Sequence, residues 1–260
     1  MNANFDKAAA TYDRDFTNSA IGRLQRHAVW KQLEGELKSG ETLRILEINC
    51  GTGEDALRMS SLGHKVIATD ISEEMLSVAR YKSKNLRISF LTLDIHDLGT
   101  YPLEGHFDLI FSNFGGLNCI SPEALGDFGR NAQSLLVPGG QLIAVLMPEF
   151  CLWETSYFCM KGKVKSAFRR SRRYAVANVN GSRVPTWYYS PGRFRNLLNV
   201  YFTGGKVRPV GFFVPPSYLG SFFLRYPRSL RFLGKMDSLL FRCSWLSGAS
   251  DHYYLQLFAK

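Results

Sequence analysis

The sequence contains no long apolar segment and no paired cysteine motif. None of its apolar runs reaches the roughly 18 residues that a membrane-spanning helix needs. The five cysteines are scattered and form no C-x-x-C pair, which argues against a disulfide framework and against a zinc site. Residues 1–14 carry Asp6 and Asp13 and resemble neither a secretory signal nor an acid-poor transit peptide. We therefore expect a cytoplasmic protein without a metal site.

Acidic residues are scarce in the second half of the chain. Residues 1–150 contain 14 Lys and Arg against 19 Asp and Glu, whereas residues 151–260 contain 18 against 3. The formal charge of +10 thus combines an acidic first half with a strongly basic second half. Hydrophobic residues make up 45% of the 260 residues, which is enough for one full core. We expect a single domain whose two halves have different tasks.

Strand and helix patterns alternate through the first half. Strands are predicted at 43–48, 65–70, 88–93, 107–112 and 141–147, and helices at 5–38, 55–61, 72–81 and 122–136. Alternation with nearly continuous apolar strands predicts an α/β fold whose doubly wound, Rossmann-like parallel sheet is covered on both faces. Sheets of this kind bind ligands beyond the carboxyl ends of their strands, near the point where the strand order reverses.

The second half has weaker patterns. A hairpin is predicted at 174–189 around Asn180-Gly181, a helix at 191–201, a helical stretch at 215–250, and final strands at 206–214 and 252–259. We expect residues 40–148 and the final strands to form the core. Residues 150–201 and 215–250 are expected to form an enlarged lid over the substrate.

A glycine-rich turn follows the first predicted strand. Gly51 and Gly53 allow the backbone to approach a ligand and to adopt dihedral angles that a Cβ atom would forbid. The next helix offers free N–H groups at its start. Asp70 ends the second strand, where its carboxylate can accept hydrogen bonds from both hydroxyls of an adenosine ribose. Asp94 follows the third strand and can reach the adenine amino group.

A dinucleotide-binding turn is the main alternative for this motif. Aligned to the end of the strand, the G-x-G-x-x-G pattern of such turns finds glycine only at Gly51, with Asn49 and Glu54 at its other positions. Glu47 would bring negative charge towards a pyrophosphate, whereas it suits an ammonium group. A tight turn without any ligand is the second alternative, and the spaced acids argue against it.

Five segments of the chain resemble the successive motifs of class I S-adenosylmethionine-dependent methyltransferases. They read ILEINCGTGEDA, VIATDISEEML, FLTLDIHDL, FDLIFSNFGGLNCI and LLVPGGQLIAVLMP, in the order and spacing of that family. The resemblance covers residues 5–148 and the last strands. It implies a seven-stranded sheet, mostly parallel with an antiparallel last strand. It also implies S-adenosylmethionine as the cofactor and S-adenosylhomocysteine as the product.

The resemblance further implies a role for each matching residue. The cofactor-binding residues would be Tyr12, Glu47, Asn49, Gly51, Gly53, Asp70, Ile71, Met75, Asp94, Ile95 and Ser112. Asn49 stands where the family usually has glycine, but asparagine tolerates left-handed dihedral angles better than most residues. Residues 5–12 resemble the segment that closes over the methionine part of the cofactor, with Tyr12 nearest to it. Ser112 and Asn113 would lie near the transferred methyl group.

Methyl transfer from a sulfonium requires alignment and exclusion of water, and needs a base only if the acceptor must lose a proton. His96 lies beside Asp94 at the cofactor rim and is the first candidate for that base, with a solvated loop histidine as the alternative. The catalytic candidates are His96, Asn113 and Tyr12. The amides of Asn113 and Asn118 can orient an acceptor, although ordinary turn chemistry explains both equally well.

The basic second half determines the expected partners. Arg169, Arg170, Arg172 and Arg173 form a cluster, and residues 216–246 mix aromatic and aliphatic side chains with Arg and Lys. These patterns fit a solvated face, peripheral contact with anionic lipid or, less well, nucleic-acid binding. We expect methyl transfer to oxygen, nitrogen or carbon of a small lipophilic or aromatic acceptor. The alternatives are an RNA or protein methyltransferase that docks through the basic half, and a cofactor-binding protein without turnover.

Overall fold

The computed structural model describes residues 5–37, 40–84, 86–103, 105–172, 174–179 and 182–260. Its strands are β1 (Arg44–Ile48), β2 (Lys65–Asp70), β3 (Ile88–Thr92), β4 (Phe107–Ser112), β5 (Leu136–Leu146), β6 (Ala175–Val179), β7 (Ser182–Thr186), β8 (Phe202–Val210) and β9 (His252–Ala259). Its α-helices are α1 (Ala9–Tyr12), α2 (Ala20–Leu37), α3 (Glu54–Ser61), α4 (Glu73–Lys82), α5 (Leu125–Ser134), α6 (Leu152–Met160), α7 (Val164–Ala167), α8 (Pro191–Leu198), α9 (Gly220–Phe223) and α10 (Pro227–Leu240). Shorter helical segments are η1 (Asp6–Ala8), η2 (Asp13–Thr17), η3 (Ile95–Asp97), η4 (Gly116–Cys119), η5 (Ser217–Leu219) and η6 (Ser244–Gly248).

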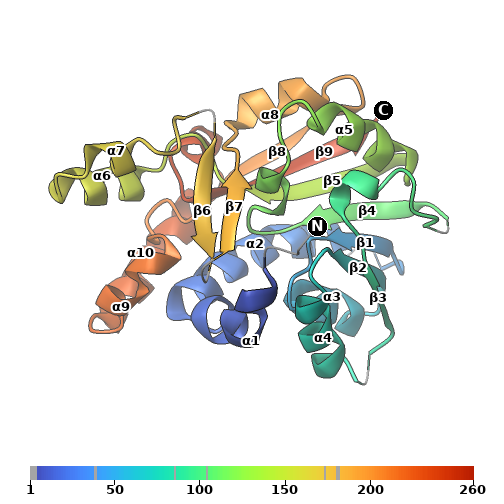
Figure 1. Cartoon of the computed structure of the whole chain (residues 1–260), viewed down its shortest axis with the longest axis horizontal. Coiled ribbons are helices and arrows are strands. Elements are labelled where there is room, and N and C mark those ends of the chain that lie inside the picture. Colours follow the sequence, from blue (N-terminus) through green and yellow to red (C-terminus); the bar gives the residue numbers. More distant parts are fainter. Residues whose placement is uncertain (1–4, 38–39, 85, 104, 173, 180–181) are drawn as a thin grey trace.

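Seven strands form one sheet in the order β3-β2-β1-β4-β5-β9-β8. Strands β1 to β5 pair in parallel, whereas β9 runs antiparallel to both of its neighbours, β5 and β8 (Figure 1). The Rossmann-like α/β sheet with an antiparallel last strand is therefore confirmed. The strand order reverses between β1 and β4, which makes the carboxyl end of β1 the expected place for a ligand.

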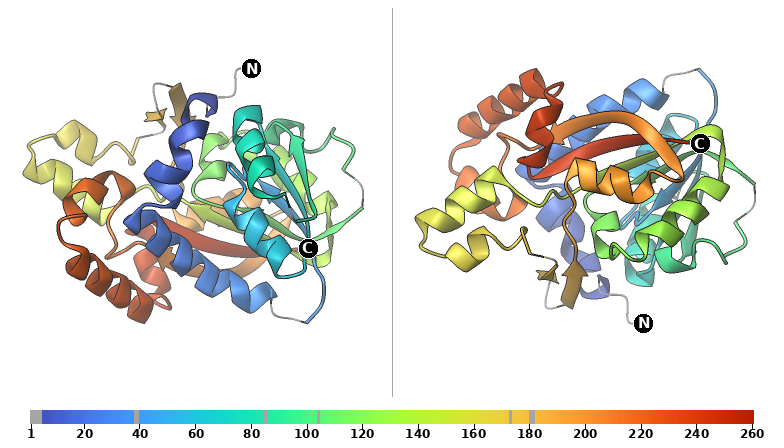
Figure 2. Two further views of the ribbon diagram at one scale, coloured as in Figure 1. Left: turned by 90° about the horizontal axis from the view of Figure 1, so that it is seen from below. Right: turned by 90° about the horizontal axis from the view of Figure 1, so that it is seen from above.

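The sheet separates two apolar layers, because successive side chains of a strand point to opposite faces. Leu46 and Ile110 belong to the layer that α5 and α8 cover, and Ile45 and Leu109 belong to the layer that α2 and α3 cover. The two views in Figure 2 look onto these two covered faces. Burial on both sides explains why the predicted strands read as nearly continuous apolar runs.

The predicted bounds of the sixth core strand were wrong. β8 spans Phe202–Val210 rather than 206–214. The strand continues through Gly204-Gly205 because it bulges there, and Gly205 lies so close to β9 that a Cβ atom would come within 2.5 Å of the Gln256 carbonyl oxygen. Gly211, with φ at 70°, then turns the chain out of the sheet, a conformation that glycine adopts without strain.

Two further boundaries differ from the predictions. β5 begins at Leu136 instead of 141, because a shift in its pairing with β4 carries the chain past Pro138-Gly139-Gly140 without ending the strand. The stretch predicted as helical, 215–250, is divided into η5, α9, α10 and η6. Pro227 lacks a backbone N–H and starts α10 as its first residue, which separates that helix from α9.

Two groups of elements lie between the last strands of the sheet. α6, α7, the β6–β7 hairpin and α8 connect β5 to β8, while η5, α9, α10 and η6 connect β8 to β9. The hairpin predicted at 174–189 is confirmed in the antiparallel pair β6 and β7, and its turn residues Asn180-Gly181 lie outside the described residues. Within the described ranges, no helix is long and apolar enough to span a bilayer.

A buried ion network joins α6 to the start of β9. Arg169 donates two hydrogen bonds to Glu154, from Nε at 2.6 Å and from Nη2 at 2.8 Å. Arg170 bridges two acids, since its Nη2 lies 3.1 Å from Glu154 Oε2 and 2.7 Å from Asp251 Oδ1. Gln25 Nε2, on α2, donates to Asp251 Oδ2 at 2.9 Å. The network therefore fixes the first connecting group to both the sheet and α2.

This network corrects the interpretation of the arginine cluster as part of a basic surface. Arg170 is only 4% exposed, and Arg169 is bonded to Glu154. Arg172 is exposed, whereas Arg173 lies outside the described residues. Arg170 is buried between two acids, and Arg169 is half-exposed but paired with Glu154, so neither is a free surface charge.

Candidate functional site

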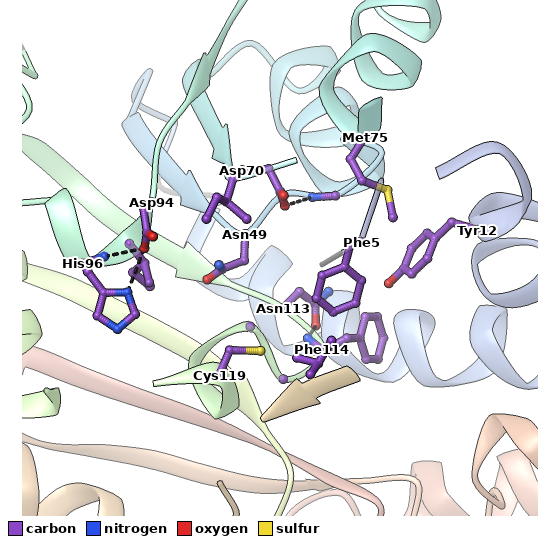
Figure 3. A pocket seen from close by; sticks show the side chains of 16 residues that line it. Phe5, Tyr12, Asn49, Asp70, Met75, Asp94, His96, Asn113, Phe114 and Cys119 are labelled. Carbon is purple, nitrogen blue, oxygen red and sulfur yellow. Dashed lines mark hydrogen bonds and ion pairs between the residues drawn. The ribbon is translucent and has the colours of Figure 1, made fainter. Parts of the chain in front are cut away.

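A cavity of about 220 Å³ lies where the carboxyl ends of β1, β2 and β4 meet (Figure 3). Ten of the predicted site residues line it, namely Tyr12, Asn49, Gly51, Asp70, Ile71, Met75, Asp94, Ile95, His96 and Asn113. Glu47, Gly53 and Ser112 do not line this cavity. The fold thus brings together residues from four of the five sequence motifs and from the N-terminal segment at the point where the strand order reverses.

The turn after β1 contains three residues with a left-handed backbone. The angle φ is 57° at Asn49, 54° at Gly51 and 74° at Gly53, so Asn49 adopts the conformation that we expected an asparagine to tolerate. A Cβ atom on Gly51 would meet nothing within 4 Å, whereas one on Gly53 would lie 2.8 Å from the Ala79 Cβ. Gly51 therefore presents open backbone to the cavity, and Gly53 allows α3 to pack closely against α4.

The carboxylate of Asp70 is held at the end of β2. The Gly51 N–H donates to Oδ2 at 2.8 Å, and the Ser72 N–H donates to Oδ1 at 2.9 Å. Burial nevertheless raises the pKa of Asp70, because removal from water disfavours the ionised form more than these donors stabilise it. A ligand that donates further hydrogen bonds to this carboxylate would compensate for the lost hydration.

Asp94 and His96 form a pair at one side of the cavity. The His96 Nδ1 lies 2.7 Å from Asp94 Oδ1, and the His96 backbone N–H donates to the same oxygen at 3.0 Å. Burial opposes ionisation of Asp94, but the hydrogen bonds from His96 prevail and lower its pKa. Figure 3 shows this pair on the opposite side of the cavity from Phe5 and Tyr12.

The amide of Asn113 is bonded at both ends. Its Nδ2 donates to Asp55 Oδ2 at 2.8 Å, and its Oδ1 accepts from the Phe114 N–H at 2.9 Å. Asp55 also binds Arg26 and accepts from Trp30 Nε1 at 2.7 Å. Burial opposes ionisation of Asp55, yet the Arg26 charge and the hydrogen bonds lower its pKa. Asn113 therefore fixes the left-handed Phe114, with φ at 46°, through an amide whose nitrogen is bonded to Asp55.

Asn118 is engaged in turn chemistry, which is the second of the two interpretations that the sequence left open. Its Nδ2 donates to the carbonyl oxygens of Met147 at 3.1 Å and Trp187 at 2.6 Å, and its Oδ1 accepts from the Met147 N–H at 2.9 Å. Asn118 thus fastens the end of β5 to the segment after β7. Ser112 is also buried, and its Oγ donates to Asn49 Oδ1 at 3.4 Å.

The N-terminal segment, residues 5–17, closes one side of the cavity. Phe5 and Tyr12 line it and pack with Met75 of α4. Burial raises the pKa of Tyr12 to about 12, despite the nearby Arg26 charge, so the phenol is a neutral hydrogen-bond donor at pH 7. The chain is π-helical at η2, a form that occurs frequently at functional sites.

Asp13 anchors this segment to the body of the domain. Its Oδ1 accepts from Thr52 Oγ1 at 2.6 Å, and its Oδ2 accepts from Lys82 Nζ at 2.8 Å. Burial opposes ionisation of Asp13, but these two partners lower its pKa. Because Thr52 belongs to the glycine-rich turn, Asp13 couples the position of the N-terminal segment to that turn.

Glu47 lies beneath the turn with one carboxylate oxygen unpaired. It is only 2% exposed, and its Oε2 has no hydrogen-bond partner among the described residues. Burial and then the negative charge of Asp55 raise the pKa of Glu47 well above its usual range. A cationic group at the turn would supply the partner that this carboxylate lacks.

Replacing Glu47 with Gln is expected to raise the free energy of unfolding at pH 7. Because the pKa of the folded state lies above that of the unfolded state, this carboxyl favours folding below about pH 4, and its contribution is lost as the pH rises. Each unit of displacement corresponds to about 1.4 kcal/mol. Urea unfolding between pH 4 and pH 8 should show the gain growing with pH. The exposed Glu74→Gln variant is the control, and a destabilised Glu47→Gln variant at pH 7 would contradict this account.

Several lining residues were not among the predicted site residues, namely Phe114, Gly115, Gly116, Cys119 and Val184. The first three follow Ser112-Asn113 directly at the end of β4, so their position in the sequence could have indicated that they line the site. Burial raises the pKa of the Cys119 thiol to about 11, which leaves it as an apolar wall and not a nucleophile. Val184 comes from β7, far along the chain, where no local pattern indicates contact with the site.

Known proteins resemble this chain in sequence around the site. Residues 45–140 match the family model described as a methyltransferase domain. The chain is 32% identical over 146 residues to a demethylmenaquinone methyltransferase of Clavibacter sepedonicus, which covers 55% of this chain and 56% of that protein. It is 34% identical over 155 residues to a malonyl-[acyl-carrier protein] O-methyltransferase of Erwinia pyrifoliae, covering 59% and 53%. A tRNA 5-carboxymethoxyuridine methyltransferase of Escherichia coli is 29% identical over 113 residues, covering 41% and 43%.

Solved structures agree with the fold along the whole chain. The CcbJ methyltransferase from Streptomyces caelestis superposes with a TM-score of 0.61 at 16% identity, covering 99% of this chain and 98% of that chain. Magnesium protoporphyrin IX methyltransferase from Synechocystis PCC 6803, solved with bound S-adenosylhomocysteine, gives 0.57 at 14% identity, covering 96% and 87%. The chain is thus similar to methyltransferases in sequence over residues 45–140 and in fold along its whole length. The chain spans little more than half the length of the first two relatives.

Proposed function

We propose that this chain binds S-adenosylmethionine in the cavity and catalyses transfer of its methyl group to a small lipophilic or aromatic acceptor. Three observations support a fit to this cofactor. The backbone at Gly51 borders open space, the Asp70 carboxylate faces the cavity, and Glu47 has an unpaired oxygen beneath the turn. When bound, the cofactor supplies an already activated methyl group, so the protein has to bind, orient and exclude water.

The predicted roles can be assigned to this geometry. Asp70 would accept hydrogen bonds from the ribose hydroxyls, and Asp94 from the adenine amino group, with Ile71, Met75 and Ile95 in contact with the cofactor. Glu47 would attract the ammonium group from beneath the turn formed by Asn49 and Gly51. Gly53 and Ser112 act indirectly in this proposal, by allowing α4 to approach and by holding the Asn49 side chain.

The character of the remaining wall supports an apolar acceptor. Phe5, Phe114, Cys119 and Val184 leave mainly carbon and sulfur atoms facing the cavity, beside the neutral phenol of Tyr12. Among the described lining residues there is no Lys or Arg, so the wall offers no countercharge to a phosphate or carboxylate. Small-molecule sites are typically lined in this way, with few polar groups that fix orientation.

Tyr12, Asn113 and His96 divide the positioning and proton-transfer tasks in this proposal. Tyr12 donates a hydrogen bond to an acceptor or to the methionine part, and Asn113 holds Phe114 against the acceptor. Asp94 accepts from the His96 Nδ1–H, which leaves Nε2 free to accept a proton. Since His96 lies across the cavity from Tyr12, it can serve only an acceptor whose ionisable group reaches that side.

Calorimetric titration with S-adenosylhomocysteine tests the cofactor assignment, and we expect one site per chain. Absence of binding would overturn the proposal. Incubation with S-adenosylmethionine and a graded series of phenols, quinones and carboxylic acids then tests the acceptor. Methyl transfer to the apolar compounds of this series would support the proposed acceptor class. Transfer only to RNA or protein would favour the docking alternative, and binding without any turnover would favour a cofactor-binding protein.

Replacing Asp13 with Asn is expected to weaken S-adenosylhomocysteine binding about tenfold. The amide keeps the size of the side chain but loses the charge that holds Lys82, and a charge-assisted hydrogen bond contributes about 1.5 kcal/mol or more. The N-terminal segment would then close the cavity less often. The neighbouring Asp15→Asn is a matched control, because Asp15 pairs with Arg14 at the surface. Equal affinities of the two variants would show that Asp13 does not control closure.

A further inference from the structure

Two stretches of the connecting groups pack into one projecting body. They are residues 152–168, with α6 and α7, and residues 217–240, with η5, α9 and α10, and we call them together the insertion module. The rings of Trp153 and Phe223 lie 6.2 Å apart, and those of Tyr157 and Tyr218 lie 6.1 Å apart. Leu230 of α10 packs towards α2 in the same cluster. Figures 1 and 2 show α6, α7, α9 and α10 at the same end of the molecule.

The exposed charge of the insertion module has a single sign. Its exposed charged residues are Lys161, Lys163, Lys165, Arg225, Arg228, Arg231 and Lys235. Both stretches are fully described, and their only acids are Glu154 and Asp237. Glu154 is buried in the ion network, while Asp237 accepts from the backbone N–H groups of Phe213 at 2.7 Å and Val214 at 3.0 Å. Both acids are therefore engaged in internal hydrogen bonds, and the exposed charged residues of the insertion module are all cations.

Large apolar side chains are exposed among these cations. Met160 is 80% exposed, Val164 59%, Phe222 58%, Leu224 73%, Tyr226 51%, Phe232 62% and Leu239 74%. Isolated exposed apolar residues are ordinary, but this number within one small module is not. The rings of Phe222 and Tyr226 also lie 5.2 Å apart, so part of the apolar surface is contiguous.

The outer face of α10 carries both kinds of side chain together. Arg228, Phe232, Lys235 and Leu239 recur at spacings of three and four residues, which places them on one side of the helix. Leu230 points to the opposite, buried side. A helix that lies in a membrane interface has this arrangement, with cations at headgroup level and apolar groups inserted beside them.

We propose that the insertion module docks this protein onto an anionic phospholipid surface. The uniform positive charge complements anionic headgroups, and the exposed Leu, Met, Val and Phe side chains enter the boundary between headgroups and acyl chains. Nucleic acid would use the cations and the rings, but aliphatic side chains such as Leu224 and Leu239 have no π face on which a base can stack. The exposed aliphatic side chains therefore favour a lipid surface over nucleic acid as the partner. This proposal goes beyond the methyl-transfer function and does not depend on it.

Vesicle co-sedimentation tests the proposal with the full chain. The wild type is expected to partition onto vesicles of phosphatidylglycerol and phosphatidylcholine in equal parts, and far less onto pure phosphatidylcholine. The combined variant Arg228→Ser, Arg231→Ser and Lys235→Ser should bind the anionic vesicles about 100-fold more weakly, at about fivefold for each cation. Phe232→Ser with Leu239→Ser should remove the part of the binding that persists at high salt.

Matched control variants lie towards the sheet edge formed by β3, around α3, α4 and β3, away from the insertion module (Figure 1). Lys65, Lys84 and Arg87 are exposed cations, and Leu62 and Tyr81 are 53% and 71% exposed. Changing the three cations to Ser, or the two apolar residues to Ser, should leave vesicle binding unchanged. All these positions are at the surface, so thermal unfolding should show at most small differences in stability.

Three results would overturn the docking proposal. These are equal partition of the wild type onto both kinds of vesicle, equal loss in the module variants and the controls, and a selective loss of single-stranded RNA binding at matched salt with unchanged vesicle binding. The last result would assign the module to nucleic acid. Titration of the same variants with S-adenosylhomocysteine keeps the two proposals separate. If the chain binds S-adenosylhomocysteine but not vesicles, only the docking proposal is rejected. If it binds vesicles but not S-adenosylhomocysteine, only the cofactor assignment is rejected.

Discussion

Replacing Asp70 with Ala is expected to weaken S-adenosylhomocysteine binding by about 100- to 10,000-fold. In the proposed complex this carboxylate accepts hydrogen bonds from two ribose hydroxyls, and hydrogen bonds to a charged group contribute about 1.5–3 kcal/mol each. The variant also leaves the Gly51 and Ser72 N–H groups without their acceptor, so the glycine-rich turn loses its fixed position. Isothermal titration calorimetry measures the effect directly.

Two further variants make this test specific. Asp70→Asn keeps the shape and one acceptor oxygen, and should fall between the wild type and Asp70→Ala. Asp108→Asn is the matched control, because Asp108 also accepts from a backbone N–H, that of Arg44 at 2.7 Å, but does not line the cavity. Burial raises the pKa of Asp70, so its ionised form opposes folding and both Asp70 variants should remain folded. Unchanged affinity in Asp70→Ala would remove the central support for the cofactor assignment.

Replacing Glu154 with Ala is expected to lower the free energy of unfolding by about 3–5 kcal/mol. The side chain is almost completely buried and receives hydrogen bonds from both Arg169 and Arg170. Without it, Arg170 is a buried charge whose remaining acidic partner is Asp251. Because a buried charge loses one of its two acidic partners and its hydrogen bonds to Glu154 are left unmade, the cost should greatly exceed the effect of breaking a surface pair. Urea or thermal unfolding of the whole chain measures it.

An exposed pair provides the comparison. Glu149→Ala breaks the ion pair with Arg193, whose side chains are 35% and 42% exposed, and should change stability by less than about 1 kcal/mol. The double variant Glu154→Met with Arg170→Met should not recover the loss, because Asp251 would then be the buried charge without its arginine partner. A destabilisation by Glu154→Ala no larger than that by Glu149→Ala would mean that water or rearrangement compensates for the lost acid.

The cofactor half of the fold could be predicted from the sequence because its signals are local. Each strand from β1 to β4 is a mostly apolar run with a polar residue at or just beyond its carboxyl end, so a single reading of the chain places Gly51, Asp70 and Asp94 at one edge of the sheet. Asn49 was the only departure from the family pattern, and its left-handed backbone shows how the turn accommodates it. The β6–β7 hairpin was equally local, through its Asn-Gly turn.

The parts that could not be predicted depend on distant contacts. The bounds of β8 follow from the close approach of Gly205 to β9, which no window around Gly204-Gly205 reveals. Arg170 looks like a surface charge, yet two acids separated by about a hundred residues in sequence, Glu154 and Asp251, hold it inside. Val184 reaches the cavity only because the hairpin folds back over it.

The hydrogen-bond partners of two asparagine side chains near the site also could not be predicted from the sequence. Asn113 and Asn118 flank a Gly-Gly turn next to the site, and sequence alone cannot distinguish a free amide from a bonded one. Three-dimensional contacts decide this, since Asp55 binds Asn113 while Met147 and Trp187 bind Asn118. The remaining uncommitted groups at the cavity, such as the phenol of Tyr12, become more important for orienting an acceptor.

The position of β9 between β5 and β8 has a consequence for how the domain folds. β8 is an edge strand, and its only partner in the main sheet is β9, so residues 202–210 cannot join the sheet before residues 252–259 have inserted. The second connecting group, with α10, separates the two strands in sequence. Closing such a long loop before pairing slows folding, because chain entropy is lost before the contacts form. We therefore expect the edge formed by β5 to remain transiently open to other chains during folding, as a late and aggregation-prone step.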